Sequence, residues 1–425
     1  MKINHRPRIA LKTLGCKANR AESDILAEKL AVAGHKIVDA KNRADIYIIN
    51  TCSVTNEADK KSRQAIRVFK HTWPDARIFV FGCGVRAHRE FYKKMPEVEL
   101  TDTRMGAILR RIGDGGVKGG RWLITSRTRA VIKIQDGCNN FCSYCVVRIL
   151  RGREKNYPLK EILARINQKL REGYKEIVLT GINITSWKDR NGGARTGRGY
   201  DFSDLVRLIL DNTAVSRCRI SSMEPESVNA RFAKFLKNPR LCPHIHLPLQ
   251  SGSDKILKLM RRKYDAKKIE KACALIKSAA PDAAVTTDVI VGFPSETEKD
   301  FRETVRLCKK IRFAKIHVFP YSIRNGTPAG VMPEQVDARV KNQRAKILRD
   351  LSDKMRREFI CARIGKVYEV LFEGNPKGGG ASWSGFTPNY IKVAVVSRTP
   401  LENIVKKVRL IKILPNNDAI GEVCE

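Results

Sequence analysis

The sequence predicts an α/β protein built from three successive parts. The first is a parallel sheet covered by helices, the second a partial barrel of six strand–helix units, and the third a small antiparallel β-barrel. Three patterns predict this order: strands and helices alternate over residues 9–100, a longer alternation begins near Arg129, and residues 366–414 alternate apolar and polar side chains around glycine-rich turns. A chain of 425 residues is long enough for about two to four domains.

The N-terminal part is predicted to hold three buried parallel strands, each followed by a helix. The strands are residues 9–15, 44–52 and 76–83, and the helices are residues 23–34, 57–73 and 88–95. A cysteine stands at the end of each strand: Cys16, Cys52 and Cys83. Because the ends of parallel strands share one edge of a sheet, the three thiols are expected to converge, and Gly15 and Gly82 would let the backbone approach closely. The alternative is three unrelated buried cysteines.

The middle part is predicted to be a partial barrel, joined to the first part by a glycine-rich linker over residues 114–120. Its six strands are residues 129–138, 176–183, 218–225, 244–252, 283–294 and 315–322. Helical patterns lie between them, and a charged helix over residues 333–364 closes the barrel. Functional residues are expected at the C-terminal ends of these strands. The last part is predicted to contain strands over residues 366–374, 389–397 and 403–414.

Composition narrows the class of protein. Lys and Arg number 82 against 44 Asp and Glu, which gives a net charge of +38 and favours a polyanionic partner such as nucleic acid. No apolar run approaches the ~18 residues of a membrane span, and the N-terminus lacks the apolar segment of a signal peptide. Membrane association is therefore not expected. Twelve cysteines in such a chain indicate a reducing cytoplasm, where thiols stay free for metal binding or chemistry.

A second group of cysteines lies on one short loop. Cys138, Cys142 and Cys145 follow directly on a predicted strand, within the sequence GCNNFCSYC. A zinc site or a ferredoxin-type site needs a fourth ligand nearby, but the next cysteine, Cys218, belongs to a separate strand. Three thiolates fit a 4Fe–4S cube that keeps one iron open for a substrate or cofactor.

This loop resembles the signature of the radical S-adenosylmethionine superfamily, in which an aromatic residue precedes the last cysteine. Cys138, Cys142, Tyr144 and Cys145 match it position by position. The resemblance implies that S-adenosylmethionine chelates the open iron and yields a 5′-deoxyadenosyl radical when an electron enters. The six strand–helix units would then form a partial (βα)6, TIM-like radical S-adenosylmethionine barrel.

The whole chain resembles the methylthiotransferases. LGCKANRAESD, NTCSVTNEADKKSRQ, LPLQSGSDKILKLMRR and DVIVGFPSET follow in family order. The resemblance implies a methylthiotransferase N-terminal domain over residues 6–118, a radical S-adenosylmethionine core over 124–356 and a TRAM barrel over 360–425. It also implies that Cys16, Cys52 and Cys83 hold a second 4Fe–4S cluster that presents sulfur.

Three branches of this family compete. TNEADKKSRQ and GFTPNYIKV most resemble the branch that modifies carbon 2 of N6-threonylcarbamoyladenosine next to the tRNA anticodon. The alternatives are N6-isopentenyladenosine in tRNA and an aspartate of a ribosomal protein; a rival of another class is a non-catalytic RNA-binding protein with a structural metal centre. The implied partners are the tRNA anticodon stem-loop, a sulfur donor and an electron donor such as flavodoxin or ferredoxin.

Further residues at strand ends are candidate contacts of S-adenosylmethionine. The resemblance implies that Gly181 and Asn183 lie nearest its amino group, although Asn183 could instead cap the next helix. Polar partners for the ribose and carboxylate are also needed, and Glu224, Gln250 and Ser251 are the candidates, with a structural ion pair as the alternative for Glu224.

The remaining polar candidates are less specific. Asp288 lies in an apolar strand and must have a partner. Arg148, Arg151 and Arg153 are expected at the mouth of the pocket, and the family usually has Pro and an aromatic residue where this chain has Arg148 and Ile149. His244 and His246 are interpreted as hydrogen-bonded residues rather than metal ligands.

The predicted C-terminal barrel combines basic and aromatic side chains, a combination that suits RNA, with an edge strand protected by lysines as the alternative. They are Lys366, Lys392, Lys406, Lys407, Arg409, Lys412, Tyr368, Phe386 and Tyr390.

Overall fold

The N-terminal part forms a five-stranded parallel sheet in the order β2-β1-β3-β4-β5. The computed structural model describes residues 7–103, 105–113, 128–190, 199–374 and 382–424. The strands are β1 (Arg8–Thr13), β2 (Lys36–Val38), β3 (Ile46–Thr51), β4 (Arg77–Gly82) and β5 (Leu100–Thr101). The helices are α1 (Lys17–Val32), α2 (Asn56–Thr72), α3 (Cys83–Ala87), α4 (Arg89–Lys93) and α5 (Met105–Ile112).

The central strand of this sheet shows why helices cover both faces. Ile46 and Ile48 of β3 pack with Leu26 of α1 on one face, whereas Tyr47 and Ile49 pack with Ile66 of α2 on the other. An uninterrupted apolar strand with both faces buried is typical of a parallel sheet. The three predicted strands are confirmed, and the structure adds β2, β5, α3 and α5, which are short. The predicted linker lies outside the described residues.

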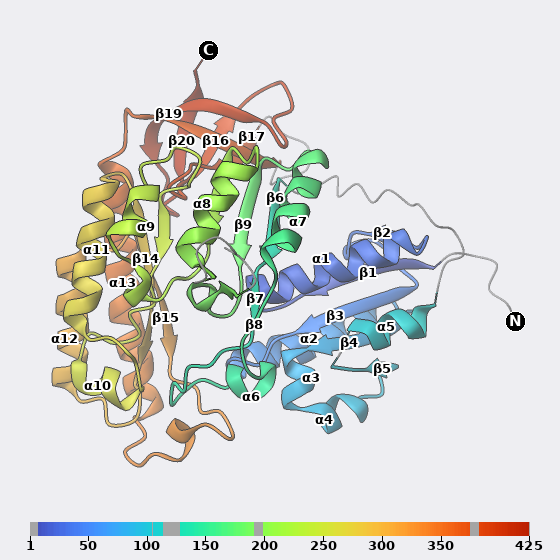
Figure 1. Ribbon diagram of the computed structural model, residues 1–425. Coiled ribbons are helices and arrows are strands. Elements are labelled where there is room, and N and C mark those ends of the chain that lie inside the picture. The colour runs from blue at the N-terminus through green and yellow to red at the C-terminus, as the bar shows by residue number, and fades with distance from the viewer. Residues whose placement is uncertain (1–6, 104, 114–127, 191–198, 375–381, 425) are drawn as a thin grey trace, which may run out of the picture.

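Six parallel strands form the predicted partial barrel. Two sheets of three strands, β12-β9-β6 and β13-β14-β15, meet through bridges between Cys218 and Leu241 and between Ser222 and His246. The strands are β6 (Arg129–Lys133), β9 (Glu176–Thr180), β12 (Arg217–Ile220), β13 (His244–His246), β14 (Ala284–Val291) and β15 (Lys315–Pro320). The helices α7 (Leu159–Arg171), α8 (Phe202–Asn212), α9 (Ala230–Phe235), α11 (Ala266–Ala279) and α12 (Glu298–Ile311) lie on the outside (Figure 1).

Shorter helices and strands lie in the connections between the barrel elements, and site residues are expected where these connections follow the barrel strands. They are β7 (Gln135–Asp136), α6 (Val147–Arg151), β8 (Lys155–Asn156), η1 (Ile184–Ser186), β10 (Lys188–Asp189), β11 (Tyr200–Asp201), η2 (Pro225–Ser227), α10 (Asp254–Leu259) and η3 (Pro328–Val331).

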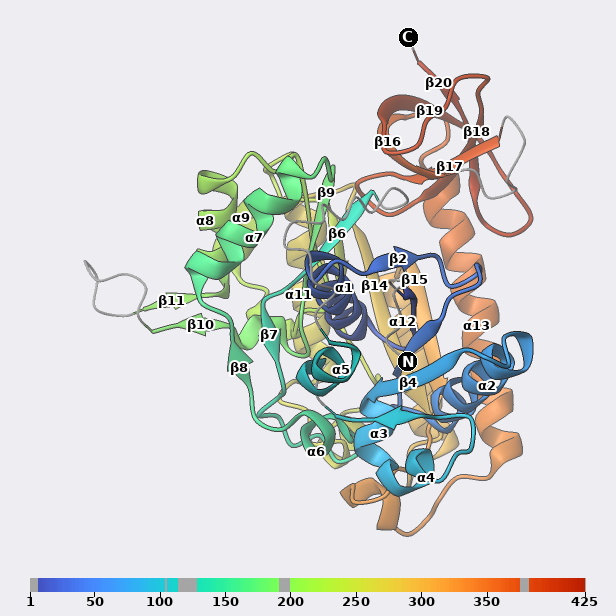
Figure 2. The same cartoon turned by 90° about the vertical axis from the view of Figure 1, so that its right-hand side faces the viewer.

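The N-terminal sheet lies across the open side of the barrel (Figure 2). Helix α1 packs against β6 and β9 at one margin. At the other margin, Arg324 follows β15 and its Nη1 lies 2.7 Å from Asp59 Oδ2 of α2, with both side chains buried. The two margins of the barrel are therefore joined through the N-terminal domain. None of the helices in the described part of the chain is long and apolar enough to span a membrane.

The chain ends in a closed five-stranded barrel that follows the long helix α13 (Ala338–Cys361). Its strands are β16 (Val367–Gly374), β17 (Ser382–Phe386), β18 (Lys392–Val396), β19 (Val405–Ile413) and β20 (Ala419–Val423). The order is β16-β17-β18-β20-β19, and only the β18–β20 pair is parallel. The predicted small β-barrel is confirmed, but two of its five strands, β17 and β20, were missed because each is short and contains a glycine.

This barrel is docked on the N-terminal ends of the core strands. Arg219 of β12 pairs with Glu176 of β9 at 2.6 Å and donates a hydrogen bond to the carbonyl of Pro388 at 2.9 Å. Burial alone would raise the pKa of Glu176, but Arg219 and Arg217 lower it to about 2. The carboxylate is therefore ionised at neutral pH and holds the arginines toward the C-terminal barrel.

Candidate active site

Hydrogen bonds hold the loop that carries Cys138, Cys142 and Cys145 against the end of α10. The backbone N–H of Ser143 donates to the carbonyl of Met260 at 3.1 Å, and its hydroxyl donates to the carbonyl of Leu259 at 2.7 Å. Tyr144 packs against the apolar cluster that contains Met260 and Phe293. The aromatic residue of the motif thus holds the loop in place from the side of α10.

Burial disfavours the ionised form of two thiols of this loop. Burial raises the pKa of Cys138, and burial together with the neighbouring thiols of the triad raises the pKa of Cys145 to about 12. The opposing cation is Arg262, whose Nη1 lies 3.1 Å from Cys142 Sγ. A bound metal would favour the same thiolates, because metal ligation requires deprotonated sulfur.

Arg262 also starts a line of contacts that leads across the strand ends. Its Nη2 pairs with Glu224, which follows β12. Burial raises the pKa of Glu224, and Arg262 opposes that rise. The backbone N–H of Glu224 donates to Thr185 Oγ1 at 3.5 Å, and Thr185 Oγ1 donates to Asn183 Oδ1 at 3.0 Å. The structure thus brings together Cys142, Glu224 and Asn183, and Asn183 makes no side-chain cap to the helix after it.

The other predicted cofactor contacts occupy different positions. Gly181 lines the main cavity, and a Cβ there would lie 2.8 Å from the carbonyl oxygen of Gln135. Gln250 has a φ of 65° and its backbone bridges to β14. The fully buried side chain of Ser251 lies 3.3 Å from Thr304 Oγ1 of α12. Ser251 therefore packs against the outer helix α12.

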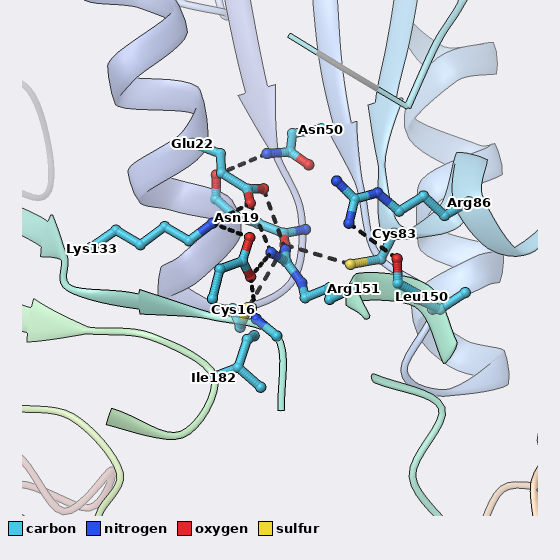
Figure 3. A network of polar contacts seen from close by, with 12 residues as sticks. Cys16, Asn19, Glu22, Asn50, Cys83, Arg86, Lys133, Leu150, Arg151 and Ile182 are labelled. Carbon is cyan, nitrogen blue, oxygen red and sulfur yellow. Dashed lines mark hydrogen bonds and ion pairs between the residues drawn. The ribbon is translucent and has the colours of Figure 1, made fainter. Parts of the chain in front are cut away.

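The second triad is assembled from three strand ends, as the topology predicted. Cys16 precedes α1, Cys52 follows β3 and Cys83 begins α3. Asn19 Oδ1 lies 3.7 Å from Cys16 Sγ and 3.9 Å from Cys83 Sγ (Figure 3). Burial, with smaller contributions from Cys16 and Cys83, raises the pKa of Cys52 to about 11.

The two glycines of this triad are required by space and by backbone conformation. Gly15 has a φ of 94°, and a Cβ on it would lie 2.8 Å from Cys52 Sγ. Gly82 has a φ of 103°, and its Cβ would lie 2.3 Å from Asn50 Oδ1. A side chain at either position would displace the strand ends that carry the thiols.

A buried ion network connects this triad to the contiguous loop (Figure 3). Arg151, the last residue of α6, donates to Asn19 Oδ1 at 2.5 Å and pairs with Glu22 at 2.7 Å and with Asp136 at 2.9 Å. Lys133 of β6 pairs with the same two carboxylates, each at 2.7 Å. The expectation that Arg151 lies at the pocket mouth is therefore wrong: the carboxylates of α1 and β7 draw it into the domain interface.

The residues on either side of Arg151 stay near the surface. Arg148 Nη1 donates to the carbonyl of Asn139 at 3.2 Å, and its guanidinium carbon lies 3.7 Å from the centre of the Phe141 ring. Ile149 is 57% exposed, and Arg153 is exposed as well. With Arg148 and Ile149 in place of the usual Pro and aromatic residue, the loop ends in the short helix α6.

The donor atoms of each triad, three free thiols, are those that an iron–sulfur cluster requires. In the part of the chain that the structure describes, no three His, Cys, Asp or Glu side chains come close enough to hold one metal ion. Each thiolate of a 4Fe–4S cube binds a different iron, so its ligands lie farther apart than those of a tetrahedral zinc.

A cavity of about 640 Å³ adjoins the second triad. Its walls come from all three domains: Gly15–Ala18, the inward faces of the barrel strands, and the turn between β17 and β18. Inside it, Asp288 Oδ2 lies 3.2 Å from His246 Nε2, and Thr286 Oγ1 lies within 3.2 Å of ring nitrogens of both His244 and His246. Asp288 is partly exposed and has the partner that was expected, and the two histidines are hydrogen-bonded residues as interpreted.

Known proteins share this arrangement of domains. Residues 132–308 match the Radical SAM superfamily, and residues 8–101 match the Uncharacterized protein family UPF0004. Threonylcarbamoyladenosine tRNA methylthiotransferase MtaB of Bacillus subtilis is 36% identical over 95% of this chain and 94% of its own. The chain belongs to the radical S-adenosylmethionine tRNA methylthiotransferases. The MtaB protein of Thermotoga maritima is 33% identical over 90% of both chains.

The chain is also similar to one further curated relative and, in fold, to a solved structure. tRNA-2-methylthio-N(6)-dimethylallyladenosine synthase of Acetivibrio thermocellus is 34% identical over 89% of this chain and 83% of its own. A solved structure of the radical S-adenosylmethionine methyltransferase TsrM from Kitasatospora setae aligns with a TM-score of 0.51 at 14% identity, over 77% of this chain and 75% of that one. This last likeness concerns the fold alone. Membership in an enzyme family rules against the rival of a non-catalytic RNA-binding protein.

Three site residues of this methylthiotransferase were missed in the sequence: Asn19, Thr185 and Arg262. Asn19 and Arg262 lie inside LGCKANRAESD and LPLQSGSDKILKLMRR, the segments that carry the family resemblance, so a signal was present. Nothing in the sequence pairs Arg262 with Cys142, because 120 residues separate them.

Proposed function

We propose that this enzyme adds a methylthio group to carbon 2 of N6-threonylcarbamoyladenosine next to the tRNA anticodon. The observation that carries the proposal is the similarity to the MtaB proteins of Bacillus subtilis and Thermotoga maritima across nearly the whole chain. The proposal assigns residues 6–118, 124–356 and 360–425 to the methylthiotransferase, radical and TRAM domains. It places the reaction in the cytoplasm.

The six cysteines are the proposed ligands of two clusters, Cys138, Cys142 and Cys145 for one and Cys16, Cys52 and Cys83 for the other. When bound, the first cluster and S-adenosylmethionine supply the radical that activates the C–H bond, and the second cluster presents the sulfur. Arg262 balances the charge of the first triad and orients Glu224 and Asn183 toward the cofactor. Gly181 leaves room beside the strand end, and Gln250 shapes the neighbouring turn.

Contacts between residues of the protein also fix the position of one cysteine triad relative to the other. Arg151 lies six residues after Cys145 and contacts Asn19, which in turn touches Cys16 and Cys83. Buried ion pairs break at a large cost once one partner is removed, so this contact resists separation of the domains. The reacting base can therefore meet both triads in one place.

The proposed RNA surface is the exposed face of β19. Lys406, Lys407, Arg409 and Lys412 are exposed there, together with Lys366 before β16. Two of the three aromatic residues expected to stack on RNA lie elsewhere: the Tyr390 ring stacks on Phe386 and on His244, at 4.8 and 4.6 Å between ring centres. The third, Tyr368 of β16, packs against the apolar cluster of the C-terminal barrel. Lys392 is paired with Asp418. Phosphate contact by β19 is thus proposed without base stacking on these rings.

An electron donor such as flavodoxin or ferredoxin and a sulfur donor complete the proposed partners.

A second candidate substrate is N6-isopentenyladenosine, favoured by the 34% identity to the dimethylallyladenosine synthase of Acetivibrio thermocellus. The deciding experiment is mass spectrometry of tRNA nucleosides from a deletion strain and from the same strain carrying the gene on a plasmid. We expect methylthio-threonylcarbamoyladenosine to disappear and to return with the plasmid. Loss of methylthio-isopentenyladenosine instead would assign the second candidate.

A further inference from the structure

The cavity beside the second triad carries more positive charge than its own walls neutralise. Its basic lining residues are Lys17, Lys315, Arg356 and Lys392, and its acidic ones are Asp288 and Asp418. Both acids already have partners, His246 at 3.2 Å and Lys392 at 2.9 Å. The cavity is therefore electrostatically prepared for an anionic ligand.

Lys17 is the cation closest to the predicted chemistry. It is the first residue of α1, directly after Cys16, and its side chain is accessible from the cavity. Among the residues that the structure describes, no carboxylate pairs with Lys17 and no acceptor binds its ammonium group. The neighbouring groups are the hydroxyl of Tyr390 and the guanidinium groups of Arg129 and Arg219. These arginines bind Glu373 and Glu176, so neither carboxylate is left for Lys17.

We propose that Lys17 binds the carboxylate of the N6-threonylcarbamoyl group and thereby selects the substrate. The inference rests on the proposed function, since it names the part of the proposed substrate that this site binds. A charge-assisted hydrogen bond between ammonium and carboxylate is about twice as strong as a neutral one.

The chemistry of adenine explains why this position is useful. The N6 substituent is attached to carbon 6, and the reacting carbon 2 lies on the other side of ring nitrogen 1, on the same edge of the base. A residue adjacent to Cys16 that holds the substituent therefore turns this edge toward the second triad. The cavity volume of about 640 Å³ lies within the usual range for sites that enclose a small molecule.

The same contact excludes the rival substrate. An isopentenyl group has no charge and would leave the ammonium of Lys17 without a partner. Sites built to bind a polar group reject the analogue that lacks it by up to about 10⁴-fold. Lys17 is thus a specificity-determining residue that touches the substrate tail.

The test compares two anticodon stem-loop RNAs with the cluster-loaded enzyme. One carries N6-threonylcarbamoyladenosine, and the other carries the same nucleoside with the threonyl carboxylate converted to an amide. We expect the unmodified enzyme to prefer the acid over the amide by about tenfold or more, in both kcat/KM and equilibrium binding. Lys17→Met should lower kcat/KM and affinity for the acid RNA to the values for the amide RNA. Lys17→Arg should keep part of the preference for the acid.

The matched control is Lys29→Met, an exposed lysine on the same helix, which should keep the full preference. Iron content and 5′-deoxyadenosine formation are measured for every variant. If Lys17→Met retains the acid-to-amide ratio of the unmodified enzyme, or loses iron, the carboxylate contact is refuted. If the unmodified enzyme acts on an isopentenyl stem-loop but on neither threonyl RNA, the proposed function itself fails.

Discussion

The two cysteine triads reach similar surroundings by opposite routes. Cys138, Cys142 and Cys145 lie on one loop, whose position depends on hydrogen bonds to the end of α10. Cys16, Cys52 and Cys83 come from three strand ends, and the sheet itself brings them together. Each triad has one buried arginine from another part of the chain beside it, Arg262 for the first and Arg151 for the second. A loop triad needs an anchor, whereas a sheet triad needs glycines that let its strand ends approach.

The largest expected effect separates the roles of the triads. Cys142→Ala should abolish cleavage of S-adenosylmethionine, whereas Cys52→Ala should retain cleavage and lose methylthiolation. Each variant should lower the iron content of anaerobically reconstituted protein from about eight to about four per chain. Iron analysis and chromatography of 5′-deoxyadenosine measure both outcomes. Full methylthiolation by Cys52→Ala would show that the second triad presents no sulfur.

A second variant tests the connection between the triads. Arg151→Gln leaves Glu22 and Asp136 with one cation in place of two, and breaking a buried pair costs about 3–5 kcal/mol. We expect a lower melting temperature and more cleaved S-adenosylmethionine for each methylthio group formed.

The control for this variant is Arg153→Gln, two residues away and exposed. Melting curves and the ratio of the two products decide between them. Equal melting temperatures and equal product ratios for the two variants would mean that Arg151 does not fix the position of one domain relative to the other.

The arginine of the first triad gives a smaller, local effect. Arg262→Gln removes the cation that lowers the pKa of Glu224, so this pKa should rise. Binding of S-adenosylmethionine should weaken by about tenfold if one charge-assisted contact is lost. Its decline toward low pH should begin at a higher pH than in the unmodified enzyme, because the carboxylate is protonated earlier.

Titration of S-adenosylmethionine at several pH values measures this effect. The neighbouring Arg261 is exposed, and Arg261→Gln should leave both affinity and pH dependence unchanged. An unchanged pH dependence in Arg262→Gln would separate Glu224 from the cofactor site.

The smallest expected effect leaves both triads intact. Lys407→Gln removes one exposed charge from β19. The slope of log affinity for tRNA against log salt concentration should decrease by about one, with iron content unchanged. Filter binding at several salt concentrations measures the slope. A slope equal to that of the unmodified enzyme would place the RNA on another face.

The difference between the loop triad (Cys138, Cys142 and Cys145) and the sheet triad (Cys16, Cys52 and Cys83) also explains what could be predicted from the sequence. The loop triad was visible as a spacing motif, and the sheet triad followed from cysteines at the ends of three alternating strands. All six barrel strands were identified, because each is an apolar run between helical patterns. Arg151 was assigned to the wrong place because its partner Glu22 lies 129 residues away. Strands β17 and β20 contain Gly385 and Gly421, which weaken the strand pattern although the barrel needs small residues there: a Cβ would lie 2.3 and 2.4 Å from the facing strands.

The cavity beside the second triad is a chamber with walls from three domains, and this has a consequence for how such enzymes diversify. The floor, formed by Phe386 and Tyr390, belongs to the C-terminal barrel, while the thiols belong to the other two domains. Exchanging that barrel between related enzymes would reshape the chamber without altering a single metal ligand. New substrate preferences can thus arise by recombination of whole modules, with the iron chemistry inherited unchanged.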